Sequence, residues 1–231
     1  MEVSKSDATP VRRAALMVGS PRTKKSTSAS LGGYLFEQLK ARGVETQTIQ
    51  IYTSLYSQKR MSAMLEAIES SDLVVLAFPL YVDSLPAPVI AALERIAAHR
   101  HENPGSTRFA AIANCGFPGA NHNDTALTIC SQFARQNGFE WMGGLSLGAG
   151  EGIVHGVPLN ELDGRAIPLK GALDLAAEAL AAGNPIPQTA KDLLAKPIIP
   201  AWMYTLTGRF GWRQAAKQYG MEKDLKRQPY R

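Results

Sequence analysis

Five short segments of strand-like character are separated by stretches of helical periodicity. Residues 14–18, 73–78 and 109–113 are continuously apolar, which is typical of parallel strands covered on both faces. Residues 141–147 give a further strand. Residues 46–51 alternate polar and apolar positions, as a half-exposed edge strand does. The pattern therefore predicts five strands.

Helices are expected between these strands. Leu31, Leu35 and Leu39 recur at a spacing of four residues and would share one helix face. Asp124 is placed to cap a helix that closes at Gly138. Further helices are expected over residues 62–68, from Pro86 or Pro88 through Ile96, and over residues 168–180.

The order of these elements predicts the fold. Strands that alternate with helices pair in parallel through right-handed crossovers, which places helices on both faces of the sheet. Residues 46–51 form the most polar strand and belong at an edge, which favours the strand order 2-1-3-4-5. We therefore expect an α/β fold with a doubly wound, open parallel five-stranded sheet. Ligands of such sheets bind at the switch point, so the loops after Val18, Phe78 and Ala113 form the expected site.

The composition is that of one packed globular domain. Of the 231 residues, 45% are hydrophobic and 19% charged, and no apolar run approaches the roughly 20 residues that span a bilayer. Cys115 and Cys130 are too few and too widely spaced for a disulfide framework or a zinc site, so no metal is expected. The N-terminus lacks an apolar segment with a cleavage site, and we expect the protein to be cytoplasmic.

The formal charge of +5 is concentrated near the C-terminus. Residues 209–231 hold seven Lys and Arg against two acidic residues, which leaves the rest of the chain neutral. A nucleic-acid-binding domain would place its charges along a groove or a reading helix, so we expect no nucleic-acid partner.

The chain is expected to have three parts. Residues 1–13 form a flexible lead-in, residues 14–195 the α/β domain, and residues 196–231 a helical extension. The extension is too apolar from Pro197 onward for a solvated tail. We expect it to pack on the domain or on a second subunit of a homodimer or higher homo-oligomer, although aromatic residues beside a basic run also permit weak contact with a membrane surface.

The first loop, residues 19–28, has the chemistry of an anion site. It combines hydroxyls and cations with a helix N-terminus, whose free N–H groups and dipole favour a phosphate. The GxxxxGK[ST] order of a Walker loop and the GxGxxG fingerprint are both absent. The candidate ligands of the phosphate are Ser20, Arg22, Ser26, Thr27 and Ser28.

The second and third loops offer a wall for a flat ring. The second loop supplies apolar and aromatic atoms with backbone donors and acceptors, and Tyr81 is the expected packing residue. The third loop is turn-rich, so its backbone can approach a ligand closely. The candidates from both loops are Pro79, Leu80, Tyr81, Val82, Asn114, Cys115, Gly116 and Phe117. Asp83 and Ser84 are expected to cap the following helix rather than to perform chemistry.

Five other features are weaker candidates. Cys115 is expected to be a buried structural thiol, since no histidine is paired with it by a recognisable motif. His122, Glu151 and His155 are candidates by position alone. The glycine-rich residues 148–152 follow the fifth strand and could form one wall of a substrate cleft.

Two of these segments resemble motifs of the NADPH-dependent FMN reductase branch of the flavodoxin-like superfamily. Residues 19–22 (GSPR) with residues 26–28 (STS) resemble its loop for the FMN phosphate, and residues 78–86 (FPLYVDSLP) resemble its segment along the isoalloxazine ring. The resemblance covers residues 14 to about 150 and is specific in combination. The compact cysteine motif of the superfamily's iron–sulfur members is absent.

The resemblance implies a flavodoxin-like FMN-binding domain and an NAD(P)H-dependent oxidoreductase. FMN would be the cofactor, with NADPH or NADH as co-substrate and the chemistry at N5 of FMN, so no catalytic side chain is required. Electrons would pass to a small-molecule acceptor such as a quinone, a flavin or a nitro- or azo-aromatic compound.

Two alternatives remain on the same fold. An electron-transfer flavodoxin would bind FMN without its own NAD(P)H reaction, although such shuttles are short and acidic. An interaction module would keep the fold without FMN. A phospho-accepting receiver domain is disfavoured, because it needs acidic residues where the first strand here ends in Gly-Ser-Pro-Arg.

Overall fold

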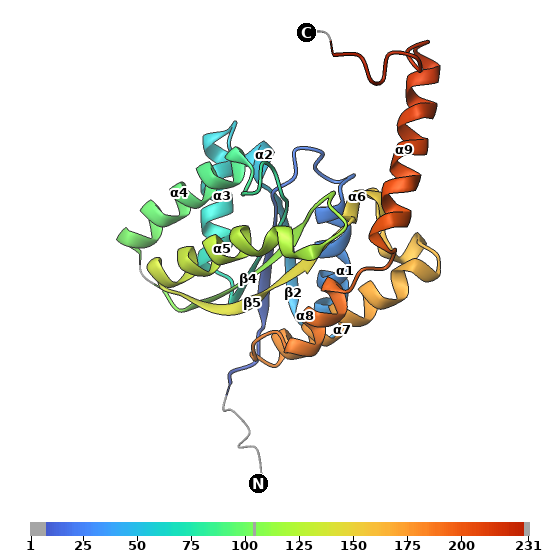
Figure 1. Cartoon of the computed structure of the whole chain (residues 1–231). Helices are drawn as coiled ribbons and strands as arrows, with labels where there is room; N and C mark the ends of the chain where they lie inside the picture. The colour runs from blue at the N-terminus through green and yellow to red at the C-terminus, as the bar shows by residue number, and fades with distance from the viewer. Residues whose placement is uncertain (1–7, 104, 229–231) are drawn as a thin grey trace.

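The computed structural model describes residues 8–103 and 105–228 and shows a parallel sheet between two layers of helices (Figure 1). The five strands have the order β2-β1-β3-β4-β5, as the sequence predicts. The fold is flavodoxin-like. The strand bounds are β1 Arg13–Val18, β2 Glu45–Gln50, β3 Leu73–Pro79, β4 Thr107–Asn114 and β5 Phe139–Leu147.

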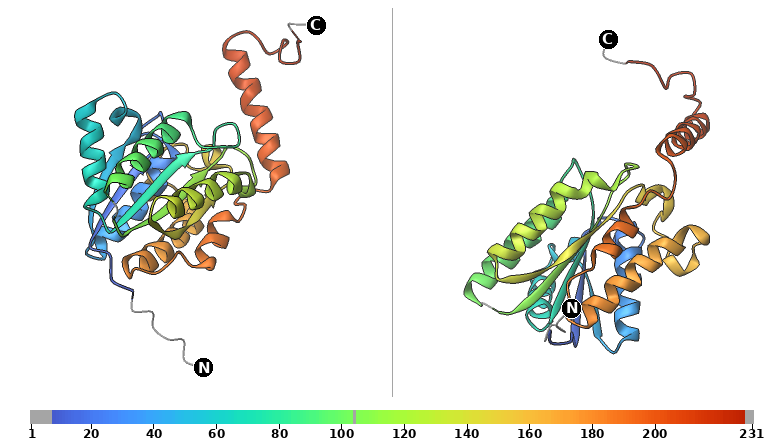
Figure 2. Two further views of the ribbon diagram at one scale, coloured as in Figure 1. Left: turned by 90° about the vertical axis from the view of Figure 1, so that its left-hand side faces the viewer. Right: turned by 60° about the horizontal axis from the view of Figure 1, so that its bottom comes forward.

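The helices divide between the two faces of this sheet (Figure 2). Helices α1, α7 and α8 pack on one face, and α3, α4 and α5 pack on the other. Their bounds are α1 Thr27–Ala41, α2 Ile51–Ser54, α3 Gln58–Glu69, α4 Ala87–Glu102, α5 Asp124–Gln136, α6 Gly150–Ile153, α7 Ile167–Ala181, α8 Gln188–Ala195 and α9 Ala201–Gln218.

The strand periodicity produces two separate cores. Ala14, Leu16 and Val18 of β1 are buried in the core beneath α1 and α7. Ala15 and Met17 point the other way, into the core beneath α3 and α4. A central strand that is buried on both faces must be apolar at every position, which explains the continuous apolar runs of β1 and β3.

Three local expectations differ from the structure. Ile51 begins α2 and does not end β2. Asp124 is the first residue of α5, and Asn123 holds the position before it. Helix α8 was not expected, because Pro185 and Pro187 mark residues 184–187 as a loop and α8 has only eight residues.

The expected lead-in is ordered close to β1. Residues 1–7 lie outside the described residues. Val11 is buried, and its N–H donates to the carbonyl of Ala181 at 3.0 Å. Arg13 already belongs to β1. The flexible lead-in expected over residues 1–13 therefore does not include its last three residues.

The C-terminal extension forms α9, which extends away from the domain beyond the carboxyl ends of the strands (Figure 1). Its start is attached to the domain: Ile198, Ile199 and Tyr204 are partly buried against the core of α1 and α7. Most of its large side chains are exposed and do not pack on the domain, and the alternative expectation that they pack on a second subunit stays a prediction. These exposed side chains are Trp202, Leu206, Phe210 and Trp212.

Candidate active site

Three strand ends meet at the carboxyl edge of the sheet. Strand β3 lies between β1 and β4, with Val18 beside Ala77 and Pro79 beside Asn114. The chain leaves β1 and β3 toward opposite faces, and this switch point opens a cavity of about 220 Å³. The sequence predicts a site at this edge.

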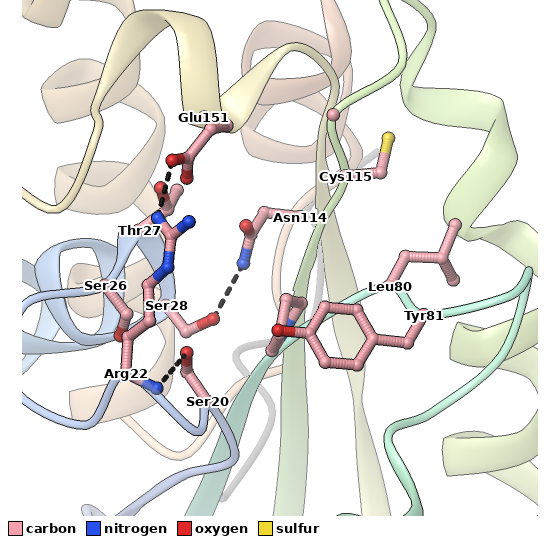
Figure 3. Close-up of a pocket in the computed structure, with 12 residues that line it drawn as sticks. Ser20, Arg22, Ser26, Thr27, Ser28, Leu80, Tyr81, Asn114, Cys115 and Glu151 are labelled. Atoms are coloured by element: carbon pink, nitrogen blue, oxygen red, sulfur yellow. Dashed lines mark hydrogen bonds and ion pairs between the residues drawn. The ribbon is translucent and has the colours of Figure 1, made fainter. Parts of the chain in front are cut away.

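The cavity collects most of the residues that were expected to form a site (Figure 3). The predicted residues that line it are Ser20, Arg22, Ser26, Thr27, Ser28, Pro79, Leu80, Tyr81, Asn114, Cys115 and Gly116. Val82 and Phe117 are not among the lining residues, whereas Glu151 is. The role of each residue toward a cofactor remains a prediction.

The N-terminus of α1 forms one wall of the cavity. Ser26 has the extended backbone of an N-cap, and its Oγ accepts a hydrogen bond from the N–H of Ala29 at 3.2 Å. The first turn of α1 contains no acidic residue, so its N–H groups and dipole attract an anion. Ser20, Thr27 and Ser28 are buried beside this turn. Hydroxyls and helix N–H groups thus face the same side of the cavity.

Gly19 lets the first loop leave β1 at close range. Its N–H donates to the carbonyl of Ala77 at 2.8 Å. A Cβ at this position would lie 2.5 Å from Cγ2 of Val89 and 3.1 Å from Cβ of Phe78. Only glycine lets the loop pass this close to Val89 without displacing α4, which accounts for the glycine at the start of the first loop.

Asn114 ties two of the loops together. Its side-chain amide donates to Oγ of Ser28 at 2.8 Å and to the carbonyl of Phe78 at 3.0 Å. The backbone carbonyl of Asn114 accepts a hydrogen bond from the N–H of Leu80 at 2.7 Å. Because Asn114 is buried, these bonds fix the first and second loops against the end of β4.

The second loop places Tyr81 at the mouth of the cavity. Tyr81 and Ser84 exchange two backbone hydrogen bonds across a tight turn, in which Val82 and Asp83 have φ of 50° and 55°. Positive φ is costly for a β-branched residue, so Val82 is strained. Tyr81 points across the cavity toward the first loop (Figure 3).

The same turn corrects two expectations. The side chain of Val82 is 98% exposed and does not contribute to the cavity wall. Helix α4 starts after Pro86 with no side-chain cap, so Asp83 and Ser84 do not cap it. Both residues serve the turn that carries Tyr81.

The third loop contributes its backbone rather than a reactive thiol. Burial raises the pKa of Cys115, and its Sγ lies 3.6 Å from the carbonyls of Phe117 and Gly119. The thiol is therefore protonated at neutral pH, as expected for a structural cysteine. The ring of Phe117 stacks on His122 with 4.4 Å between the ring centroids, and neither residue lines the cavity.

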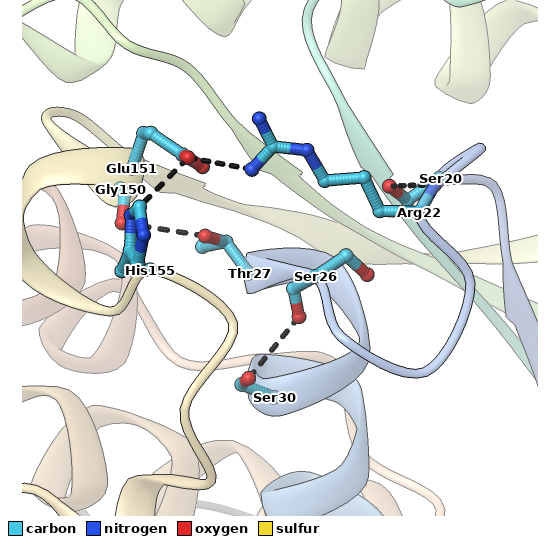
Figure 4. A network of polar contacts seen from close by, with 8 residues as sticks. All are labelled: Ser20, Arg22, Ser26, Thr27, Ser30, Gly150, Glu151 and His155. Carbon is cyan, nitrogen blue, oxygen red and sulfur yellow. Dashed lines mark hydrogen bonds and ion pairs between the residues drawn. The ribbon is translucent and has the colours of Figure 1, made fainter. Parts of the chain in front are cut away.

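Glu151 of α6 lines the cavity, although the sequence offers it as a candidate by position alone. Its Oε1 accepts from Nη1 of Arg22 at 2.5 Å and lies 3.3 Å from Nδ1 of His155 (Figure 4). The hydrogen bond to Glu151, with its charge, raises the pKa of Arg22. Oγ1 of Thr27 donates to the carbonyl of Gly150 at 3.3 Å, which holds α6 against α1. The glycines on either side of Glu151 allow α6 to approach α1 closely. They are the sequence feature that could have pointed to Glu151.

The C-terminal extension also reaches the site. The hydroxyl of Tyr204 donates to the carbonyl of Gly116, a lining residue, at 2.8 Å. Its ring packs against Gly152, where a Cβ would lie 2.8 Å from Cε2 of Tyr204. Burial is the main cause that raises the pKa of Tyr204, so the hydroxyl keeps its proton and donates. No pattern in the sequence links residue 204 to the third loop.

The donor set of the cavity suits a phosphate ester attached to a flat ring. One wall offers hydroxyls, a helix N-terminus and the guanidinium of Arg22, which has donors beyond the one used by Glu151. The opposite wall offers Pro79, Leu80 and Tyr81. No cluster of three metal-binding side chains occurs in residues 8–103 and 105–228.

Comparisons with known proteins agree with this geometry. The family model described as NADPH-dependent FMN reductase matches residues 12–149. A comparison with curated proteins finds no match. A flavone reductase structure has a TM-score of 0.57 at 12% identity, covering 78% of this chain and 69% of its own.

Two further solved structures share the fold. An FMN-dependent NADH-azoreductase from Bacillus anthracis, in complex with FMN, has a TM-score of 0.53 at 14% identity, covering 74% of this chain and all of its own. An NAD(P)H:quinone oxidoreductase from Methanothermobacter marburgensis has a TM-score of 0.53 at 15% identity, covering 74% of this chain and 96% of its own. Because the matched family model spans more than half of the sequence, the chain belongs to the NADPH-dependent FMN reductase family.

Proposed function

We propose that the protein is an FMN-dependent oxidoreductase that uses NADPH or NADH to reduce a planar aromatic acceptor, with quinones and azo compounds as the leading classes. The observation that supports this most directly is the convergence of three strand-end loops on one open cavity, with anion donors on one wall and Tyr81 on the other. The quinone oxidoreductase and azoreductase of similar fold support the choice of acceptors.

The first loop would hold the phosphate of FMN. The hydroxyl of Ser28 would donate together with the free N–H groups of α1, and Arg22 would balance the charge. The hydroxyls of Ser26 and Thr27 donate here to the carbonyls of Thr23 and Gly150 and would turn toward the phosphate on binding. Ser20 would support the loop, since its Oγ accepts from the N–H of Arg22 at 3.3 Å. These groups are already assembled, which reduces the ordering cost of binding.

The second and third loops would orient the ring. Pro79, Leu80 and Tyr81 would pack on it, while backbone groups from Asn114 to Gly116 would meet its polar edge. When bound, FMN supplies the transfer of two electrons from a reduced nicotinamide nucleotide to the acceptor. Tyr81 is 46% exposed, so an aromatic surface remains available at the mouth where nucleotide and acceptor would enter in turn.

An absorbance titration tests this proposal. The purified full-length chain is incubated with FMN, desalted and then treated anaerobically with NADPH or NADH. Retained flavin that bleaches with either nucleotide, and recovers its absorbance on addition of menadione or methyl red, is the expected result. Comparing the rates for a quinone, an azo dye, a nitroaromatic compound and riboflavin identifies the acceptor class.

Other outcomes point to the alternatives. Flavin that is retained but resists both nucleotides would assign the protein to electron transfer. No retained flavin would favour an interaction module on the same fold. The proposed homodimer or higher homo-oligomer is tested separately by light scattering of the purified chain, with and without FMN.

A further inference from the structure

Helix α9 presents an unpartnered apolar stripe. Trp202, Leu206 and Phe210 recur every four residues and therefore share one face of the helix. Their exposed fractions are 68%, 60% and 64%, which is unusual for three large side chains in one row. The stripe does not cover the domain, because α9 extends away from it in every view (Figures 1 and 2).

A basic stripe runs beside the apolar one. Arg209, Arg213 and Lys217 also recur every four residues, and at 100° per residue they interleave with the apolar row. Leu206, Arg209, Phe210 and Arg213 line one common hollow of the surface. Residues 201–221 contain no acidic residue, so this face is positive and apolar throughout.

The opposite side of α9 is the attached side. Tyr204 lies across the helix from Trp202 and Leu206, and it bonds to Gly116 in the third loop. The apolar and basic stripes consequently point away from this attachment.

A second copy of the chain is a poor partner for this face. In a symmetric dimer the same patch would meet itself, so the cluster of Arg209, Arg213 and Lys217 would face a second copy of that cluster. Juxtaposed like charges cost several kcal/mol. The chain outside residues 209–231 is neutral overall, so it offers no net negative charge to attract the patch.

An anionic bilayer surface complements both stripes. We propose that α9 and the basic residues that follow it bind the surface of an anionic membrane. Trp, Phe and Leu side chains enter the boundary between headgroups and acyl chains, while Arg and Lys reach lipid phosphates. None of the described helices is long and apolar enough to cross a membrane. In the proposed contact α9 lies along the membrane surface.

The contact would hold the cavity close to the lipid. Tyr204 joins α9 to Gly116, and α9 is about 27 Å long at 1.5 Å per residue over 18 residues. The mouth of the cavity would therefore stay within about one helix length of the surface, where apolar acceptors accumulate. Binding to the membrane does not itself depend on FMN.

Flotation with lipid vesicles tests the proposal. The full chain is mixed with vesicles of phosphatidylcholine alone or with added phosphatidylglycerol, and the bound fraction is measured at low and high salt. We expect binding only to the anionic vesicles, weakened by salt, with a blue shift of the tryptophan emission from Trp202.

Two variants separate the contributions. Replacing the cations, R209Q/R213Q/K217Q, should lower the partition coefficient on the order of 100-fold, at about 1 kcal/mol per cation. Replacing the apolar row, W202Q/L206Q/F210Q, should cause a loss of similar size. The matched control K40Q/K59Q/R60Q removes three exposed cations from the domain and should bind as the unmodified chain does.

The opposite results overturn the proposal. Absence of binding to anionic vesicles, or equal loss in the control variant, would exclude a specific role for α9. A concentration-dependent dimer that W202Q/L206Q/F210Q dissociates, together with no vesicle binding, would assign the face to a second copy.

Discussion

Replacing Arg22 with alanine should weaken FMN binding without harming the fold. The side chain is 60% exposed, and its partner in the structure is Glu151. An exposed ion pair contributes at most about 1 kcal/mol, so R22A should unfold at nearly the same denaturant concentration as the parent. The backbone N–H that donates to Ser20 is retained in the variant.

The loss of FMN affinity follows from the charge of the phosphate. A hydrogen bond between charged groups contributes about 1.5–3 kcal/mol, and the exposure of Arg22 reduces this to about 1–2 kcal/mol. At 1.4 kcal/mol per tenfold change, R22A should bind FMN roughly 5- to 30-fold more weakly. The difference should shrink as the salt concentration rises.

Riboflavin provides the decisive comparison, because it has the same ring system and no phosphate. Titrations followed by flavin fluorescence should show an unchanged Kd of R22A for riboflavin. Arg165 offers a matched control: it is also an exposed arginine in an ion pair, with Asp163, and lies outside the cavity lining. R165A should bind both flavins as the parent does.

The reasoning would be refuted by a uniform effect. If R22A weakens FMN and riboflavin equally, Arg22 acts on the shape of the loop and not on the phosphate. If neither affinity changes, the phosphate lies elsewhere and the assignment of the first loop is wrong.

Three further predictions concern stability. G19A should destabilise the fold by about 1–3 kcal/mol in urea unfolding, because its Cβ would meet Val89; an unchanged midpoint would contradict the close approach. V82N should raise stability by up to about 1 kcal/mol, since asparagine tolerates positive φ; a lower melting temperature would contradict the strain. Burial raises the pKa of Cys130 from about 9 to about 12, so its contribution to stability is complete below pH 9 and is lost as pH rises toward 12. In C130A this part of the alkaline loss should be absent, and an unchanged pH profile would disprove the assignment.

The fold was predictable because its strands differ in burial. Continuous apolar runs marked the strands that now lie covered on both faces, and the alternating run marked β2 at the edge. The position of the cavity followed from this order alone. The start of α5 differs by one residue from the expectation, because a 3-10 turn over Ala120–Asn123 leads directly into Asp124 without a side-chain cap.

The site was less predictable where contacts between distant parts of the chain determine the position of a residue. Glu151 reaches Arg22 from a position 129 residues later, and no local pattern encodes that meeting. Val82 sits beside Tyr81 in sequence, yet the turn directs it outward through an unfavourable backbone angle. Tyr204 reaches Gly116 because Ile198 and Ile199 pack on the domain just before it. The apolar character of this segment suggests packing on the domain but does not indicate where the contact forms.

The hydrogen bonds of Asn114 separate a fixed inner part of the cavity from the exposed tips of its loops. One buried amide fixes Ser28 and Phe78, so the frame that holds a cofactor does not depend on the loop tips. Val82 and Phe117 occupy those tips, with no part in the frame. Substitutions at the loop tips can therefore change acceptor specificity while the residues that hold the cofactor stay in place. Proteins of this fold can in this way acquire new substrates and keep the same cofactor chemistry.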